Sequence, residues 1–198
     1  MSASAKRVAA VVLAAGQGLR FGSQKLLAPL RGRPLLQHAL DAANASSLSP
    51  IVVVLGADAD AIETGVSPGR ARFVRNEDHA TGQASSLRVG LRFLDASDAA
   101  VVVLGDQPNV TAALLDALVA AQRSSGAPAV VCAQEGRRSP PTLLHRDLWK
   151  EVDALRGDTG ARDVLARHPD VAVFEVAAGL ARLDDIDTQE DRERLSRG

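Results

Sequence analysis

The stretch VAAVVLAAGQGLRFG at residues 8–22 decides the fold of this chain. It begins with an apolar run that is typical of a buried β-strand, and it passes directly into small residues and glycines. Such a loop lets backbone N–H groups approach an anion closely. Arg20 and Lys25 add two positive charges to the same loop. The stretch therefore predicts the first βα unit of an α/β fold, with a phosphate-binding site after its strand.

Two well-known phosphate loops do not match this stretch. A P-loop requires a Gly-Lys-Ser/Thr triplet after its glycines, and none follows at the required distance. The dinucleotide fingerprint matches at Gly16 and Gly18, but Phe21 occupies its third glycine position. An acidic residue about 20 residues further on, at the end of a second strand, is also missing. An NAD(P)-dependent oxidoreductase and a plain glycine turn stay open as alternatives.

Composition favours one ordinary globular domain over residues 1–198, with an ordered core at about 7–195. A formal net charge of −1 lacks the basic surface that nucleic acid or an anionic membrane requires, so neither partner is expected. The first apolar run is too short to span a membrane and lacks a signal-peptide pattern, which predicts a cytoplasmic protein. Cys132, in an apolar run, is predicted to be a buried strand thiol.

Short apolar runs alternate with stretches of helical spacing along the chain. The predicted strands are 8–13, 51–55, 72–75, 99–104, 129–133 and 171–176, and the predicted helices are 34–45, 59–66, 85–94, 111–124, 148–155 and 161–168. This repeated βα order predicts one continuous, mostly parallel sheet covered by helices. Ligands of such sheets bind beyond the carboxyl ends of the strands.

Two acidic segments are candidates for a metal site. The first is the turn Gly105-Asp106-Gln107-Pro108, directly after a predicted buried strand. The second is Leu183-Asp184-Asp185-Ile186-Asp187-Thr188, before a polar, helix-like tail at 189–196. An Asp in a tight turn can be a structural cap, but two aspartates from separate loops are sufficient protein ligands for Mg²⁺. The two segments together therefore predict a Mg²⁺ site.

Together, these three segments resemble the nucleotidyltransferases of molybdenum-cofactor maturation. The resemblance spans nearly the whole chain and includes, in the expected order, Asn76, Gly82 with Ser85-Ser86-Leu87 and Gly90, Arg137 with Pro140, and Gly157-Asp158-Thr159-Gly160-Ala161-Arg162. It implies a three-layer α/β/α sandwich with a mostly parallel mixed sheet. This is the Rossmann-like fold of the nucleotide-diphospho-sugar transferases.

The resemblance also implies roles for individual residues. The nucleotide-binding residues would be Leu13, Ala14, Ala15, Gly16, Arg20, Lys25, Asn76, Gly82 and Ser86. Arg20, Lys25 and Asp106 would be catalytic, and Asp106 and Asp187 would bind Mg²⁺. The reaction would transfer CMP from CTP to the phosphate of molybdopterin and release pyrophosphate. A phosphate acceptor is already an anion, so no general base is required.

The first loop bears on the choice of base. Leu-Ala-Gly-Gly is typical of guanylyl transfer in this family, and Leu-Ala-Ala-Gly of cytidylyl transfer. The chain has Leu13-Ala14-Ala15-Gly16, so CTP is expected rather than GTP. The methyl group of Ala15 changes how closely a base can lie on the backbone.

Some positions depart from the family pattern. Gln189 stands where the family commonly has Pro, and Arg137-Arg138-Ser139-Pro140-Pro141 stands where Arg-Gly-His-Pro is usual. The second departure leaves the acceptor open to a sugar phosphate or methylerythritol phosphate. A non-catalytic chaperone that hands its cofactor to a molybdoenzyme is a further alternative. The four histidines, His38, His79, His145 and His168, lack a metal-binding spacing and are expected to be structural or on the surface.

Overall fold

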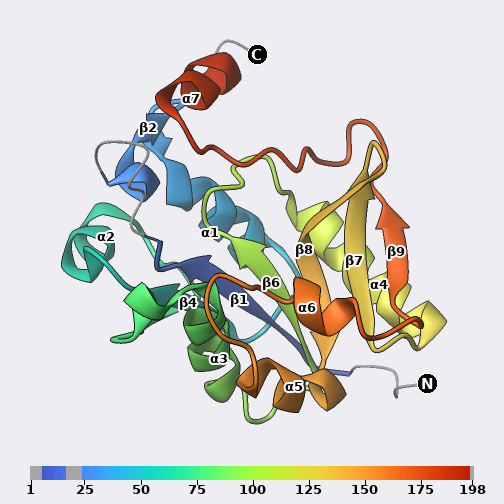
Figure 1. Ribbon diagram of the computed structural model, residues 1–198. Helices are drawn as coiled ribbons and strands as arrows, with labels where there is room; N and C mark the ends of the chain where they lie inside the picture. The colour runs from blue at the N-terminus through green and yellow to red at the C-terminus, as the bar shows by residue number, and fades with distance from the viewer. Residues whose placement is uncertain (1–5, 17–23, 197–198) are drawn as a thin grey trace.

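The computed structural model describes residues 6–16 and 24–196, and its centre is a seven-stranded sheet with the order β5-β4-β1-β6-β8-β7-β9 (Figure 1). The strands are β1 (Val8–Ala14), β4 (Ile51–Leu55), β5 (Arg72–Arg75), β6 (Ala99–Leu104), β7 (Ala129–Gln134), β8 (Arg137–His145) and β9 (Ala172–Glu175). Every pair of neighbours is parallel except those that involve β8, which is antiparallel to both β6 and β7.

Helices cover both faces of this sheet. The helices are α1 (Leu35–Ala45), α2 (Ala59–Gly65), α3 (Gln83–Arg92), α4 (Ala112–Ser125), α5 (Trp149–Asp153), α6 (Arg162–Leu165) and α7 (Gln189–Ser196). Short 3-10 turns, η2 (Lys25–Leu27), η3 (His79–Thr81) and η4 (Arg146–Leu148), and a small hairpin of β2 (Pro29–Leu30) and β3 (Arg33–Pro34) complete the elements. The predicted three-layer α/β/α fold is confirmed.

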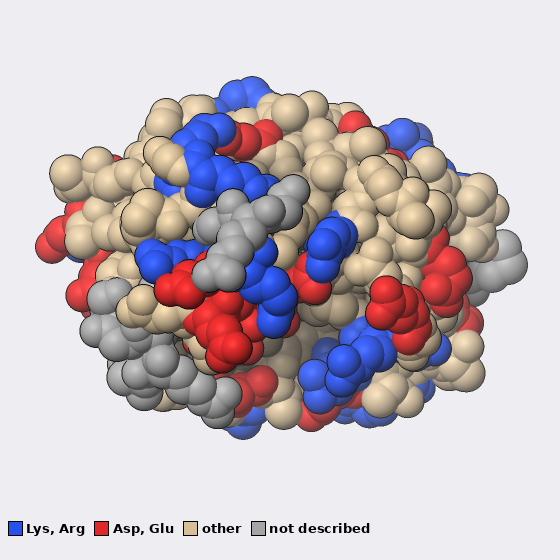
Figure 2. All heavy atoms as spheres, turned by 90° about the horizontal axis from the view of Figure 1, so that it is seen from above, with Lys and Arg blue, Asp and Glu red and all other residues tan. Residues whose placement is uncertain are grey.

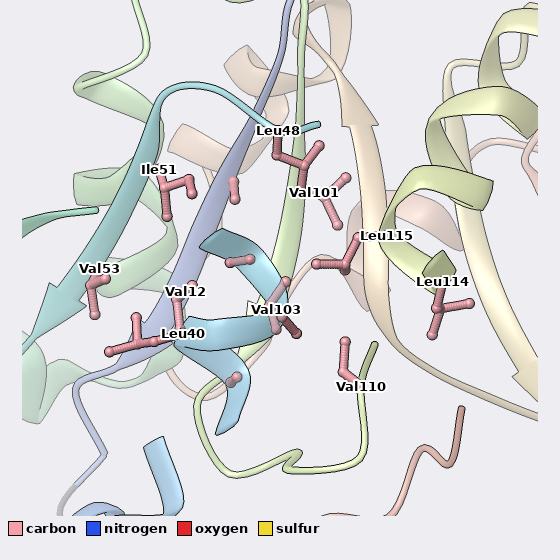
Figure 3. Close-up of a cluster of buried hydrophobic side chains, with 14 of the residues drawn as sticks. Val12, Leu40, Leu48, Ile51, Val53, Val101, Val103, Val110, Leu114 and Leu115 are labelled. Carbon is pink, nitrogen blue, oxygen red and sulfur yellow. The ribbon is translucent and has the colours of Figure 1, made fainter. Parts of the chain in front are cut away.

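Alternate residues of the strands enter two separate cores. Val12 of β1 packs with residues of α1 and α4, and Figure 3 shows this cluster around Leu40, Val103 and Leu115. Val11, the next residue back along β1, belongs to the second core, with residues of α3, α5 and α6. A strand buried on both faces has no polar side, which is why residues 8–13 form an unbroken apolar run.

Strand β8 is the one long strand that the sequence pattern failed to predict. Pro140 and Pro141 made this segment resemble a loop, because proline donates no hydrogen bond to a ladder. In the structure, Thr142 pairs with Val131 and Ser139 pairs with Cys132, so the register shifts across the two prolines. The irregularity at this point accommodates the missing N–H groups, and the strand continues on both sides of it.

Two smaller predictions concern burial and the membrane. Cys132 is fully buried in β7, as predicted, and burial raises the pKa of its thiol to about 12. Within the described part of the chain, no helix has the length and apolar character needed to cross a membrane.

Gly90 allows α3 to lie close against β1. A Cβ atom built at this position would come within 2.5 Å of Val11 Cγ1 and 3.0 Å of Val54 Cγ2. We expect Gly90→Ala to lower the free energy of unfolding by about 1–3 kcal/mol through overpacking. Chemical denaturation measures this change. The double variant Gly90→Ala/Val11→Ala should recover part of the loss, and a fully stable single variant would contradict the close packing.

Candidate active site

A cavity of about 620 Å³ lies at the carboxyl ends of the central parallel strands. Figure 2 shows this edge of the molecule from above, with acidic and basic side chains gathered around its centre. The cavity is lined by Leu13, Ala14, Ala15, Gly16, Lys25, Leu26, His79, Ala80, Gly82, Gln83, Ser86, Leu104, Asp106, Asp158 and Asp187. These residues come from six separate stretches of the chain, which only the fold brings together.

Most of the site residues predicted from the sequence line this one cavity. They are Leu13, Ala14, Ala15, Gly16, Lys25, Gly82, Ser86, Asp106 and Asp187. Asn76 does not line the cavity, and Arg20 lies outside the residues that the structure describes. The cavity also contains His79, Gln83 and Asp158, which were not predicted as site residues.

The position of the cavity follows from the strand order. The next strand of this sheet after β1 is β4, on one side of it, whereas β6, the neighbour on the other side, is followed by β7 and β8, so the chain leaves the adjacent carboxyl ends of β1 and β6 in opposite directions. Such a switch point opens a crevice beyond the strand ends. The amide of Gly105 donates to the carbonyl of Leu13 at 2.9 Å, which holds the turn after β6 beside the end of β1. Asp106 is thereby placed at the crevice.

The C-terminal acidic segment crosses this same turn. The amide of Ile186 donates to the carbonyl of Asp106 at 3.2 Å, and Gln107 Nε2 donates to the carbonyl of Leu183 at 3.4 Å. Because Ile186 and Leu183 are buried, the segment is anchored by its apolar residues. Its neighbour Asp187 is therefore held at the cavity wall.

Lys25 connects the two predicted metal ligands. Its Nζ atom lies 2.8 Å from Asp106 Oδ2 and 2.9 Å from Asp187 Oδ1, although Lys25 and Asp187 are 162 residues apart in the sequence. The Lys25 side chain is 11% exposed, whereas the side chains of Asp106 and Asp187 are 23% and 61% exposed. Burial lowers the pKa of Lys25, but the two carboxylates outweigh burial and hold this pKa above its ordinary value. The amine is therefore a charged ammonium group that both aspartates share.

The carboxylates around Lys25 fit a divalent cation. Asp106 Oδ1 is buried and accepts no hydrogen bond from any described residue, so one oxygen at the cavity has no partner. No group of three His, Cys, Asp or Glu residues with metal-binding geometry occurs in the described ranges. Mg²⁺ does not need such a group, because it commonly takes one or two carboxylates and completes its shell with phosphate oxygens and water. The donors Asp106 and Asp187 match this requirement.

Asp185 is a third carboxyl group beside this pair, and the sequence analysis did not select it. The residue is exposed overall, whereas its carboxyl group is partly shielded from water. This desolvation, together with the nearby charges of Asp106 and Asp187, raises the pKa of Asp185 to about 6. Among the described residues here, three carboxyl groups are balanced by one lysine, an arrangement that favours the binding of a cation.

The opposite wall is built on the start of α3. Gly82 has a φ of +105°, and a Cβ atom there would lie 2.2 Å from the carbonyl carbon of Gly157. The amide of Ala84 also donates to the carbonyl of Gly157 at 3.1 Å. Only glycine permits this backbone conformation and this close approach. The contact places Asp158, the residue after Gly157, in the cavity wall.

Asn76 supports this wall from behind. It is 3% exposed, and its Nδ2 atom donates to Ser85 Oγ at 2.8 Å and to Ser86 Oγ at 2.9 Å. Its Oδ1 atom accepts from the amide of Asp78 at 3.0 Å. The side chain thus fastens the loop after β5 to the first turn of α3. Its predicted role in nucleotide binding stays a prediction, and the contacts point to positioning of Ser86.

All four histidines make local contacts, and three of them do not line the cavity. His38 Nε2 lies 3.0 Å from the carbonyl of Leu30, His145 Nδ1 accepts from the amide of Asp147, and His168 Nε2 lies 2.7 Å from Glu151 Oε1. These contacts agree with the structural roles expected of them. His79 differs, because it lines the cavity.

Lys25 competes with any cation for Asp106 and Asp187. We expect Lys25→Met to tighten the binding of Mn²⁺ in the absence of nucleotide by about tenfold or more, because the variant removes a positive charge and leaves two carboxylates unbalanced. Titration followed by electron paramagnetic resonance of free Mn²⁺ measures the affinity. Lys150→Met is the matched control, because Lys150 is an exposed lysine on α5. Unchanged or weaker Mn²⁺ binding by Lys25→Met would show that the ammonium does not occupy the cation position.

Asp185 should make the stability of the metal-free protein depend on pH. Its pKa in the folded protein, about 6, lies above the ordinary value of 3.8, so the folded state loses stability as the pH rises between these values. We therefore expect Asp185→Asn to raise the thermal midpoint in EDTA at pH 7.5, and to raise it less at pH 5. Asp184→Asn is the control. An equal rise of the thermal midpoint at both pH values would show that Asp185 does not cause the pH dependence of stability.

Comparison with known proteins identifies the family. The model of the MobA-like NTP transferase domain matches residues 10–172. Nicotine blue oxidoreductase of Paenarthrobacter nicotinovorans is 30% identical over 195 residues, which cover 95% of this chain and 96% of that protein. Purine catabolism protein PucB of Bacillus subtilis (strain 168) is 32% identical over 198 residues, which cover 94% of this chain and 95% of that protein.

A solved structure gives the same result. Rv0371c from Mycobacterium tuberculosis H37Rv superposes with a TM-score of 0.84 at 29% identity, over 97% of this chain and 98% of that one. A second structure of Rv0371c, a complex with manganese, has a TM-score of 0.80 at 27% identity, over 98% of this chain and 100% of that one. The chain belongs to the family of MobA-like NTP transferases and is a nucleotidyltransferase.

Proposed function

We propose that this nucleotidyltransferase moves CMP from CTP, with Mg²⁺, to the phosphate of molybdopterin and releases pyrophosphate. The observation that carries the proposal is the group formed by Lys25, Asp106 and Asp187 beside the Leu13-Ala14-Ala15-Gly16 loop, all in one cavity. A site for phosphate charge and a loop of the cytidylyl type thus lie within the reach of a single nucleotide.

The loop supports CTP as the donor nucleotide. Ala15 is 7% exposed and lines the cavity, so its methyl group lies among the residues that a bound nucleotide contacts. Gly56 lies next to it, and a Cβ atom there would come within 2.7 Å of the carbonyl oxygen of Ala15. The backbone at Ala15 is therefore closely packed from behind. A bulky base has little freedom to displace it, which favours a pyrimidine over guanine.

The chemistry requires positioning and charge balance more than proton transfer. An oxygen of the acceptor phosphate attacks the α-phosphorus of CTP, and a new P–O bond forms as the bond from the α-phosphorus to the pyrophosphate oxygen breaks. Because the acceptor is already an anion, no side chain has to remove a proton. Lys25 offsets the charge that develops on the leaving pyrophosphate. A Mg²⁺ ion held by Asp106 and Asp187 would supply further neutralisation of the phosphates. Arg20 stays a predicted contributor from outside the described residues.

Exposed arginines at the same edge support a polyanionic acceptor. Arg137 and Arg138 begin β8, directly after β7, and β7 is parallel to β6 because β8 is antiparallel to both. The β7–β8 turn therefore lies at the carboxyl edge of the sheet, as the cavity does. Arg162 begins α6, just after the segment that packs on Gly82. None of the three side chains makes an ion pair or hydrogen bond with a residue in the described ranges, so all three are available to bind phosphate.

Two other functions need to be separated from this one by experiment. One relative is named an oxidoreductase, which keeps hydride transfer as a second candidate. The departures at Ser139 and Pro141 keep sugar phosphates and methylerythritol phosphate as alternative acceptors, and GTP stays an alternative donor nucleotide. A chaperone that hands its cofactor to a molybdoenzyme would bind molybdopterin without turnover of CTP.

Pyrophosphate release tests the proposal. Purified protein with Mg²⁺ is assayed with CTP, GTP, ATP and UTP, each with molybdopterin, sugar phosphates or methylerythritol phosphate, and NADPH oxidation is followed in parallel. We expect release with CTP and molybdopterin. Asp106→Asn and Asp187→Asn should each reduce it by about 100-fold or more, since each removes a charge-neutralising ligand. Asp170→Asn, in an exposed turn before β9, is the control.

The possible outcomes are distinct. Release with a sugar phosphate alone would overturn the acceptor and keep nucleotidyl transfer. Release with GTP alone would overturn the choice of base. Full activity of both aspartate variants would overturn the metal site, and hydride transfer without pyrophosphate release would support the oxidoreductase.

A further inference from the structure

His79 is the one histidine at the cavity, and its ring is held in a defined orientation. Nδ1 lies 3.0 Å from the carbonyl of Asn76, and the backbone amide of His79 lies 3.3 Å from the same carbonyl. A carbonyl oxygen only accepts hydrogen bonds, so Nδ1 carries the proton and donates it. In the neutral ring, Nε2 then bears a lone pair and acts as an acceptor. Nε2 has no hydrogen-bond partner within residues 6–16 and 24–196.

The support under His79 is rigid. Asn76 is buried, its amide donates to the carbonyl of Leu55 at 2.8 Å, and its side chain bonds to Ser85 and Ser86. The imidazole is thus hydrogen-bonded to a residue that is itself hydrogen-bonded to both β4 and α3. A side chain held by such a network loses little entropy when it binds a ligand.

His79 lies beside the end of β4, next to the Ala15 loop. A Cβ atom built at Gly56, the residue after β4, would come within 2.6 Å of His79 Cβ and 2.7 Å of the Ala15 oxygen. Because β4 neighbours β1 and β1 neighbours β6, the end of β4 is two strand spacings from the end of β6, or roughly 10 Å. Asp106 follows β6 and pairs with Lys25, at the end of the cavity to which the proposed function assigns the phosphates. A ribose with its pyrimidine ring spans a separation of this order, which puts the base at His79.

We propose that His79 Nε2 accepts a hydrogen bond from the 4-amino group of the cytosine and so selects CTP over UTP. This inference rests on the proposed function, since it requires a cytidine nucleotide in this cavity. Cytosine and uracil differ on this edge, because cytosine has an amino donor where uracil has a carbonyl acceptor. A lone pair at Nε2 attracts the donor and repels the acceptor. A site that offers a hydrogen-bond acceptor at this point rejects a base that also presents an acceptor there.

The experiment measures binding of Mg²⁺ complexes of CTP, UTP and the CTP analogue with hydrogen in place of the 4-amino group. Isothermal titration with wild-type protein and His79→Phe forms a double-mutant cycle between the protein and the ligand. Thr81→Ala is the matched control, because Thr81 lies in the same 3-10 turn, is exposed and does not line the cavity. We expect wild-type protein to bind CTP about tenfold or more tighter than UTP or the analogue. His79→Phe should bring the three affinities together, and Thr81→Ala should keep the wild-type order.

Each other outcome has a defined meaning. Equal binding of CTP and the analogue by wild-type protein overturns the inference, whether or not His79→Phe folds. The inference is also overturned if folded His79→Phe keeps the wild-type preference for CTP over UTP. It is overturned as well if His79→Phe loses affinity for CTP but not for 2′-deoxy-CTP, because the contact would then be to the ribose. In these cases the proposed function stands. If wild-type protein binds none of the nucleotides, the proposed function itself fails.

Discussion

The parallel pairing of β1 with both of its neighbours is the constraint on which the rest of this structure depends. Val11 pairs with Val52 of β4 on one side and with Val102 of β6 on the other. Parallel strands end at the same edge, so the loop after β1, the turn after β6 and the residue after β4 lie side by side. The glycines at these ends keep the backbones close, since a Cβ atom at Gly105 would come within 3.1 Å of the Leu13 oxygen. The cavity is a consequence of this arrangement.

The chemistry of the cavity depends on an excess of negative charge in a partly desolvated place. Asp106 and Asp187 share the ammonium group of Lys25, and the charges of both aspartates act on the nearby carboxyl group of Asp185. Water would screen these charges if they were fully exposed, but desolvation raises the pKa of Asp185 to about 6 and shows that screening is incomplete. The excess of carboxylate charge lowers the free energy of unfolding of the metal-free protein, and the same excess favours the binding of cations. A cation held by these carboxylates would also offset the charge of a nucleotide's phosphates.

The wall opposite these charges is held by hydrogen bonds and carries one carboxyl group, that of Asp158. Asn76 joins the end of β5 to α3, and the backbone contact of Gly82 with Gly157 brings in a segment from far along the chain. Buried polar networks of this kind are rigid when all of their members are satisfied. The cavity therefore combines one end where charges can rearrange around Lys25 with another end where His79 is fixed. A nucleotide has the same two-part character, with a charged triphosphate and a base of defined hydrogen-bonding pattern.

The sequence by itself determined the alternation of strands and helices, because each element leaves a local hydrophobic pattern. It also indicated Lys25 and Asp106, since glycine-rich and acidic turns after apolar runs have a recognisable composition, and the family resemblance implied Asp187. It did not reveal β8, whose two prolines lie where the ladder shifts its register. Nor did it distinguish His79, which lines the cavity, from the other three histidines, or select Asp158 and Asp185. What these residues do depends on which strands are neighbours and on contacts such as that of Gly82 with Gly157. Strand order and long-range contacts bring together residues that are distant in the chain, and no local sequence pattern records such contacts. The roles of these residues were therefore decided by the tertiary structure alone.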